Sequence, residues 1–199
     1  MLVSTAVVAH STRKADAFDL AIALDASIAY DMGEHGPGAN HRRAWQLANT
    51  PAADWILIIE DDAIPCPNFH TRLAEALTTA PTPIVSLYLG TGYPLHLVDQ
   101  AAEAMSHAQA QHKPWLTLPT MNHAVAICIR QPLVADMLHH TDPDQPIDEA
   151  IGAWAQSHSV PISYSVPSLV DHRDQPPITA HPDGLGRTRP RRAIAFDCS

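Results

Sequence analysis

Apolar runs and helical repeats alternate along the chain. Residues 2–9 form a continuous apolar, β-branched run, which is typical of a strand buried on both faces. Residues 13–24 then show helical spacing of apolar side chains, and residues 27–30 predict a short second strand. The glycines and proline of residues 33–40 predict a loop, which is followed by a helix over 41–49.

The clearest strand covers residues 54–60, where five apolar residues run into three acids. Pro65 and Pro67 then interrupt the chain, and Asn68 is expected to cap the next helix. The same patterns predict strands at 84–89, 115–118, 123–129 and 160–166, and helices at 97–112, 132–140 and 146–157.

This alternation of strands and helices predicts an α/β sandwich with a mostly parallel central sheet. The short pair of strands between 115 and 129 is expected to add antiparallel members. A length of 199 residues fits one domain, which we place at 1–175, followed by an irregular tail at 176–199 that is rich in proline and arginine.

Charge and cysteine content narrow the classes of partner. A net charge of −9 argues against a surface that binds duplex nucleic acid. The three cysteines have no metal-ligand spacing, which favours reduced thiols in a cytoplasm. The chain shows no signal-peptide pattern and no apolar run near the roughly 20 residues of a membrane helix. We therefore expect a cytoplasmic protein with no membrane partner.

The acids Glu60, Asp61 and Asp62 are the first candidate for chemistry. Ligands of open α/β sheets gather at the carboxyl ends of strands, and a divalent cation would relieve the repulsion among three adjacent acids. In an extended chain Glu60 and Asp62 point to one side and Asp61 to the other. The alternative is a solvated strand end in which Asp62 caps a local turn.

Two common nucleotide sites are excluded by their motifs. A P-loop requires G-x-x-x-x-G-K-[ST], and neither Lys14 nor Lys113 follows a glycine. A dinucleotide-binding domain requires G-x-G-x-x-G after the first strand, whereas this chain continues there with His10-Ser-Thr-Arg.

The sequence WILIIEDDA at 55–63 resembles the "hydrophobic strand, then E-D-D-A" signature of glycosyltransferases with the GT-A fold. The likeness is strongest to the lipopolysaccharide and collagen-type galactosyltransferase group and to small phage-encoded relatives. Further matching pieces follow in the family's order: His10 and Arg13, Asp31, residues 38–45, residues 146–149, and residues 167–172. The resemblance covers about residues 1–175 and implies a single-domain, Rossmann-like GT-A sandwich.

The resemblance implies a metal site. Asp62, with Glu60 or Asp61, would hold the Mn²⁺ or Mg²⁺ ion that bridges the donor diphosphate, and His172 would be a further ligand. The family's motif is usually D-x-D, and here Glu60 stands at the first position, which leaves the identity of the metal open. The alternative for His172 is an ordinary surface histidine.

The resemblance also implies residues for donor, acceptor and proton transfer. Asp148 or Glu149 would be the general base, held ionised by a helix N-terminus, although ordinary helix capping places acids there too. The donor-binding residues implied are His10, Arg13, Asp31, Gly38, Asn40 and Arg43, the last two of which are equally ordinary helix residues.

Three features outside these motifs remain open. Arg187 and Arg189, within an arginine-rich run, predict either a lid over the diphosphate or a solvated tail. Tyr93 and Trp115 are expected near loops, where their rings would stack on an acceptor sugar.

The sequence therefore predicts a metal-dependent glycosyltransferase that uses a nucleotide-diphosphate sugar, with UDP favoured, and inverts the anomeric centre. The expected acceptor is a hydroxyl of a protein or small molecule, and a modified DNA base is less favoured because of the negative charge. If the chain is phage-encoded, the compartment is the host cytoplasm. One alternative is a metal-dependent phosphoesterase built on Glu60, Asp61, Asp62 and His172, which needs a second metal about 4 Å away. The other is a nucleotide-binding protein of the same fold without catalysis.

Overall fold

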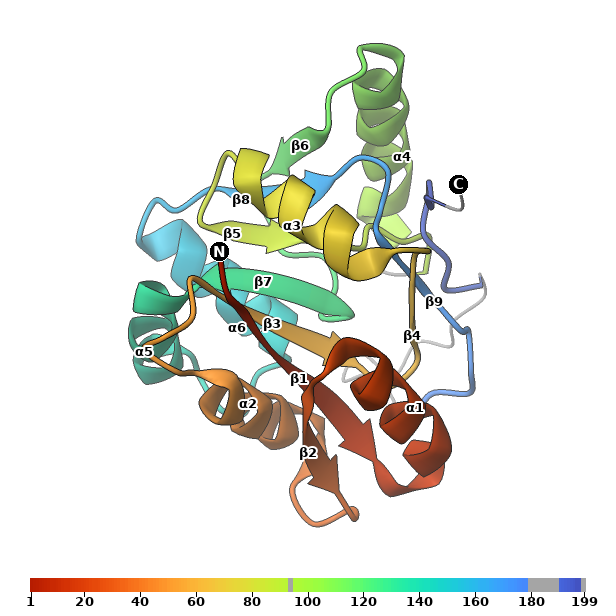
Figure 1. Ribbon diagram of the computed structural model, residues 1–199. Helices are drawn as coiled ribbons and strands as arrows, with labels where there is room; N and C mark the ends of the chain where they lie inside the picture. The colour runs from red at the N-terminus through yellow and green to blue at the C-terminus, as the bar shows by residue number, and fades with distance from the viewer. Residues whose placement is uncertain (93–94, 179–189, 198–199) are drawn as a thin grey trace.

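The computed structural model describes residues 1–92, 95–178 and 190–197 (Figure 1). A seven-stranded sheet has the order β2-β1-β3-β7-β5-β8-β6. Its strands are β1 (Val3–His10), β2 (Ser27–Asp31), β3 (Trp55–Glu60), β5 (Ile84–Ser86), β6 (Trp115–Leu118), β7 (Ala126–Arg130) and β8 (Ile162–Ser165). The helices are α1 (Lys14–Leu24), α2 (Gly36–Ala48), α3 (Phe69–Thr79), α4 (Leu95–Ala110), α5 (Gln131–His140) and α6 (Ile147–Ser157), with a 3₁₀ turn η1 (Ser11–Arg13) before α1.

The sheet is mostly parallel, as the sequence predicts. Strand β1 pairs in parallel with both β2 and β3, and β5 pairs in parallel with β8. Strand β7 is inserted antiparallel between β3 and β5, and β6 is antiparallel to β8 at the edge. The antiparallel members are the two strands expected between residues 115 and 129.

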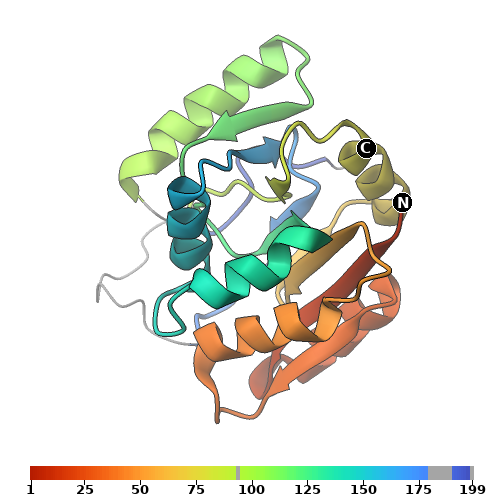
Figure 2. The same cartoon turned by 90° about the vertical axis from the view of Figure 1, so that its left-hand side faces the viewer.

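Helices cover both faces of the sheet (Figures 1 and 2). Helices α2, α4, α5 and α6 pack on one face, and α1 and α3 pack on the other. Strand β3 contributes to both cores because its side chains alternate: Ile56 and Ile58 face one, and Trp55, Leu57 and Ile59 face the other. This explains why its sequence is apolar throughout. In the part of the chain that the structure describes, no helix is long and apolar enough to cross a bilayer.

Helix α2 begins at Gly36 rather than at residue 41, so part of the predicted loop is helical. Asp31, at the end of β2, accepts backbone N–H bonds from residues 33–36 at 3.0–3.1 Å. Pro37 stands in the first turn, where its missing N–H costs nothing. The carboxylate of Asp31 therefore caps the N-terminus of α2 from outside the helix.

A second, two-stranded sheet was not predicted. Strand β4 (Ala63–Pro65) pairs antiparallel with β9 (Val170–His172), and Ala63 stands opposite His172. The pairing brings His172 back to the carboxyl end of β3. Runs of three residues are too short to show a period, so the sequence pattern gave no sign of them.

One local expectation is wrong. Asn68 precedes α3 in a left-handed conformation (φ 56°) and makes no side-chain cap bond. The described part of the tail contains no helix or strand, but isolated bridges join Ala193 to Gly90 and Phe196 to Ser168. Residues 190–197 are therefore part of the fold.

Candidate functional site

The candidate site lies at the point in the sheet where the strand order changes direction, between β1 and β3. Strand β1 lies between β2 and β3, and the chain passes from β1 through α1 on one face to β2, then through α2 on the other face to β3. Such a reversal opens a crevice at the carboxyl ends of the two central strands. His10 ends β1 and Glu60 ends β3, so the three acids stand at this crevice.

Glu60 pairs with a histidine of α2. Its Oε1 lies 3.2 Å from Nε2 of His41, a side chain that is buried. Burial by itself raises the pKa of Glu60, but the bond to His41 and the charges of His41, His172 and Arg13 lower it to about 2. His41 belongs to the 36–41 segment that the resemblance places near the nucleoside, but it was not singled out as a partner of Glu60. The signal available was a histidine in the segment directly before the acidic strand.

Asp61 and Asp62 share one buried cation. Arg13 Nη1 donates to Asp61 Oδ1 at 3.1 Å and to Asp62 Oδ2 at 2.5 Å. Asp61 Oδ2 also accepts the backbone N–H of His10 at 2.9 Å. Burial raises the pKa of both aspartates, with the charge of Glu60 adding to the effect at Asp62. Asp61 is therefore hydrogen-bonded to the end of β1, whereas Asp62 Oδ1 has no hydrogen-bond partner among the described residues.

His172 faces Asp62 from β9. Its Nε2 lies 3.3 Å from Asp62 Oδ2, and its Nδ1 accepts the backbone N–H of Asp174 at 3.0 Å. Because Nδ1 accepts, the proton of the neutral ring is on Nε2 and points at Asp62. Burial lowers the pKa of His172, which favours this neutral form. His172 is buried, so it is not the surface histidine of the alternative interpretation.

Glu60, Asp62 and His172 together offer a donor set for a divalent ion. One ligand atom from each lies within 4.8 Å of the others. Oδ1 of Asp62 is buried and has no hydrogen-bond partner among the described residues, which is costly unless a ligand completes it. Carboxylate and imidazole groups are ordinary ligands of divalent ions. A metal at Nε2 would require one change, because the His172 proton would have to move to Nδ1 and the bond to the Asp174 N–H would be lost.

The predicted base residues lie in the first turn of α6. Asp148 is partly buried, and its Oδ1 accepts the N–H of Glu149 at 3.1 Å, whereas Glu149 itself is exposed. Burial raises the pKa of Asp148, the charge of Glu60 raises it further, and His41 opposes the rise. Asp148 is thus within electrostatic reach of the Glu60–His41 pair.

Most of the predicted donor residues make contacts that build the crevice. Asn40 Nδ2 donates to the carbonyls of Ala9 and Ala29 at 3.1 and 2.9 Å, which ties α2 to the ends of β1 and β2. Arg43 Nη1 donates to Asn40 Oδ1 at 2.9 Å. A Cβ at Gly38 would lie 3.2 Å from the carbonyl oxygen of Pro143, so glycine permits close packing there.

Two further donor residues have local partners. Both carboxylate oxygens of Asp31 accept backbone N–H groups; although burial would raise its pKa, these bonds lower it below the ordinary value. The ring of His10 lies beside Thr12, with Nδ1 2.9 Å from Thr12 Oγ1. These contacts leave the donor roles of both residues as predictions.

The structure does not bring Trp115 to the acids. Its indole is buried, and Nε1 donates to Thr79 Oγ1 at 3.3 Å. Strand β6 is also separated from β3 by β7, β5 and β8. The expectation of a stacking surface at Trp115 is therefore wrong. Tyr93, Arg187 and Arg189 lie outside the described residues.

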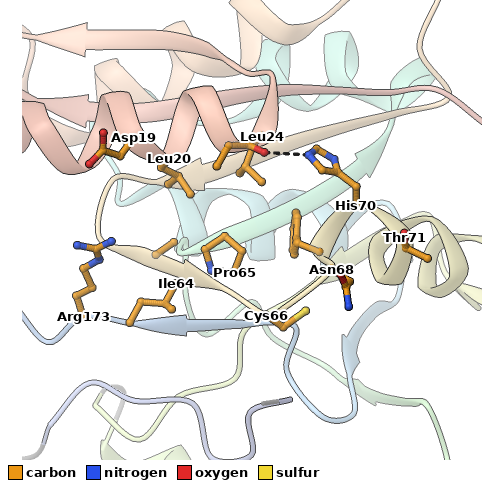
Figure 3. Close-up of a pocket in the computed structure, with 13 residues that line it drawn as sticks. Asp19, Leu20, Leu24, Ile64, Pro65, Cys66, Asn68, His70, Thr71 and Arg173 are labelled. Atoms are coloured by element: carbon orange, nitrogen blue, oxygen red, sulfur yellow. Dashed lines mark hydrogen bonds between the residues drawn. The ribbon is translucent and has the colours of Figure 1, made fainter. Parts of the chain in front are cut away.

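A cavity of about 650 Å³ is lined by residues of α1, β4 and α3 (Figure 3). Leu20, Ile64 and Phe69 contribute apolar surface, and Arg173 stands at one side. His70 Nε2 closes the opposite side through a 3.0 Å contact with the carbonyl oxygen of Ala23. None of the three acids lines this cavity, so we do not assign the donor site to it.

Comparison with known proteins supports the fold and goes no further. No family model and no curated protein matches the sequence. The structure is similar to the crystal structure of A197 from STIV, with a TM-score of 0.51 and 11% sequence identity over 98% of this chain and 96% of that chain. At this identity the likeness shows a shared mixed α/β single-domain fold.

Proposed function

We propose that this protein is a glycosyltransferase that moves a sugar from a nucleotide-diphosphate donor, with UDP favoured, to a hydroxyl group. The observation that carries the proposal is the convergence of Glu60, Asp62 and His172 at the reversal point of the sheet, with Asp62 Oδ1 left without a partner among the described residues. The sequence resemblance at residues 55–63 supplies the class of reaction.

The acids form the donor side of the proposed site. Glu60, Asp62 and His172 would hold Mn²⁺ or Mg²⁺, and this ion would neutralise the diphosphate as it leaves. Arg13 adds a fixed positive charge beside Asp62, at 2.5 Å from its Oδ2. His41 holds the Glu60 carboxylate in place through the 3.2 Å contact.

Asp148 is the proposed general base. Burial raises its pKa, which makes its carboxylate a stronger proton acceptor than that of an ordinary aspartate. In the proposed step the acceptor oxygen bonds to the anomeric carbon, the bond from that carbon to the diphosphate oxygen breaks, and the hydroxyl proton passes to Asp148. Such a direct displacement inverts the anomeric centre.

The test compares Asp148→Asn with Glu149→Gln. We expect Asp148→Asn to bind the nucleotide diphosphate as the unmodified protein does, as measured by calorimetry. The rate at which the sugar donor releases its nucleotide diphosphate should fall by about 10²-fold or more, the size of effect expected for loss of a general base. Glu149→Gln, its exposed neighbour, should keep most activity. Equal activity of Asp148→Asn and the unmodified protein would contradict the role of Asp148.

Two outcomes would favour the alternatives. Hydrolysis of phosphate esters without sugar transfer would indicate the phosphoesterase. The second group of metal-ligand side chains among the described residues is not next to the acids of β3, because it lies on α5 and directly after α6. Nucleotide binding with no turnover in the unmodified protein or in either variant would indicate a binding protein.

A further inference from the structure

A second group of ligand-type side chains lies where α5 and α6 end. Asp136 and His140 stand one turn apart on α5, and His158 directly follows α6. One ligand atom from each lies within 4.8 Å of the others. Both helices lie on the same face of the sheet (Figure 2).

The ring of His158 has two contacts at Nδ1, one with the carbonyl oxygen of Trp154 and one with Ser157 Oγ, both at 2.9 Å. Because Ser157 Oγ donates to the same Trp154 carbonyl at 2.8 Å, and a carbonyl can only accept, we assign the proton of the neutral ring to Nδ1. The lone pair of Nε2 then faces Asp136 Oδ2 at 3.5 Å. Two acceptors face each other there, an arrangement that a cation between them would stabilise. Histidines that bind metals commonly donate their other N–H to a carbonyl in this way.

Asp136 is oriented by a buried group. Trp154 Nε1 donates to Asp136 Oδ2 at 2.9 Å, and the indole of Trp154 is buried in the core. This bond lowers the pKa of Asp136, so its carboxylate is ionised. His140 Nδ1 lies 3.2 Å from Asp136 Oδ1 and also contacts the Asp136 carbonyl oxygen at 3.0 Å. An ion bound by His140 would replace one of these contacts, and the 49% exposure of the side chain leaves room for the ring to rotate.

The two imidazoles approach different oxygens of one carboxylate. Nδ1 of His140 lies 3.2 Å from Asp136 Oδ1, and Nε2 of His158 lies 3.5 Å from Asp136 Oδ2. Two ligands at about 2.0–2.1 Å from Zn²⁺ lie about 3.3–3.4 Å apart in tetrahedral geometry, so these distances are in the range that one ion spans. The C-terminal ends of α5 and α6 both meet here, and the partial negative charge of helix C-termini favours a cation.

We propose that Asp136, His140 and His158 form a binding site for Zn²⁺ or a similar divalent transition metal, with water at the fourth position. The bound ion ties the end of α5 to the end of α6. The site lies on α5 and directly after α6, and not at the carboxyl ends of β1 and β3. The proposal therefore does not depend on the proposed glycosyltransferase activity.

The test is a Zn²⁺ titration of the full chain by calorimetry, combined with thermal unfolding. We expect Zn²⁺ to bind and to raise the Tm, because it binds the folded chain. In a His172→Gln background, which removes a ligand of the other group, adding His140→Gln with His158→Gln should weaken Zn²⁺ binding at least tenfold and abolish the rise in Tm. His107→Gln, which removes an exposed histidine of α4, controls for unspecific binding and should match the unmodified protein. His172→Gln should also keep this site, which separates it from the acids at β3.

Equal Zn²⁺ affinity in this triple variant and in His172→Gln would overturn the proposal, as would an unmodified protein whose Tm does not respond to Zn²⁺. If the triple variant does not fold, Co²⁺ replaces Zn²⁺ in the unmodified protein and in Asp136→Asn. Visible absorption typical of four-coordinate Co²⁺ that disappears in Asp136→Asn supports the site, and identical spectra for the two overturn it.

Discussion

Arg13 Nη1 lies 2.5 Å from Asp62 Oδ2, and both side chains are almost fully buried, with 10% and 2% of their surfaces exposed. The same nitrogen also contacts Asp61 Oδ1 at 3.1 Å. A guanidinium of the chain therefore balances two carboxylates before any ligand arrives. A divalent ion that binds Asp62 joins a cation that is already present, so Arg13 bears on both stability and metal affinity.

We predict that Arg13→Gln lowers the free energy of unfolding by about 3–5 kcal/mol at pH 7, because it leaves two buried carboxylates without their cation. The loss should shrink as the pH falls from 7 toward 4. The pKa values of Asp61 and Asp62 are already raised in the folded state, and protonation removes the unpaired charges. Urea unfolding at several pH values measures both effects.

Arg173→Gln is the matched control for Arg13→Gln. Arg173 pairs with Asp16 at 2.5 Å, but its side chain is 42% exposed, so the loss should stay below about 1 kcal/mol. In addition, Mn²⁺ should restore part of the stability of Arg13→Gln. This description of the site would be contradicted if Arg13→Gln were as stable as the unmodified protein, or if Mn²⁺ did not change the stability of Arg13→Gln.

Substitutions of Asp61 and Asp62 should have different effects, the first mainly on stability and the second mainly on metal binding. Asp61→Asn weakens the contacts to Arg13 and to the His10 N–H, so we expect a loss of about 1–3 kcal/mol with metal binding retained. Asp62→Asn should change stability less, because Arg13 keeps Asp61, and should abolish Mn²⁺ binding at the acids. Calorimetry with Mn²⁺ and urea unfolding of both variants test this, and the reverse pattern would make Asp62 the structural residue.

Asp31 should make a pH-dependent contribution to stability. Its folded pKa lies below the ordinary 3.8, so its contribution is complete above that value and is lost as the pH falls through the folded pKa. Asp31→Asn should cost about 1–2 kcal/mol at pH 7 and at pH 5, and the difference from the unmodified protein should shrink below about pH 4. Asp142→Asn, at an exposed carboxylate that accepts the Asp144 N–H, should cost less. A pH-independent difference for Asp31→Asn would argue against the charged cap.

Removal of residues 190–199 should lower the Tm. The described part of this segment bridges Gly90 and Ser168, and Arg192 Nη1 donates to the carbonyl of His172 at 2.8 Å. We expect a loss of about 2–4 kcal/mol, or roughly 5–10 °C for a chain of this size. Thermal unfolding checks this, and an unchanged Tm would mean that the segment is dispensable.

The lid prediction for Arg187 and Arg189 needs point variants. A truncation that removed these two residues would also remove Arg192, which contacts β9. Arg187→Gln with Arg189→Gln in the full chain should weaken binding of a nucleoside diphosphate and spare binding of the nucleoside. Equal weakening of both ligands, or of neither, would contradict the lid. Calorimetric titration of the two ligands gives the answer.

The sequence pattern was a reliable guide where elements are long or uniformly apolar. The run before Glu60 predicted β3 and placed its acids at the carboxyl edge of the sheet, and helical spacing predicted α1, α5 and α6 to within two residues at each end. The sheet's parallel sense followed from the alternation of elements.

The remainder depends on contacts between distant residues. The three-residue pairing that carries His172 to Asp62 has no local signature, and the early start of α2 depends on a carboxylate from β2. The burial of Trp115 under α3 is likewise a tertiary contact. The pairing of Arg13 with Asp62 joins residues 49 positions apart, so proximity in sequence gave no sign of it.

The most direct test of the proposed function is calorimetric binding of UDP, GDP and CDP to the unmodified protein and to Asp62→Asn, each with Mn²⁺ and again with EDTA. The proposal predicts tight binding of one diphosphate, with UDP favoured, that requires Mn²⁺ and disappears in Asp62→Asn. Absence of binding of all three nucleotides with and without the metal, by a folded protein, would contradict it.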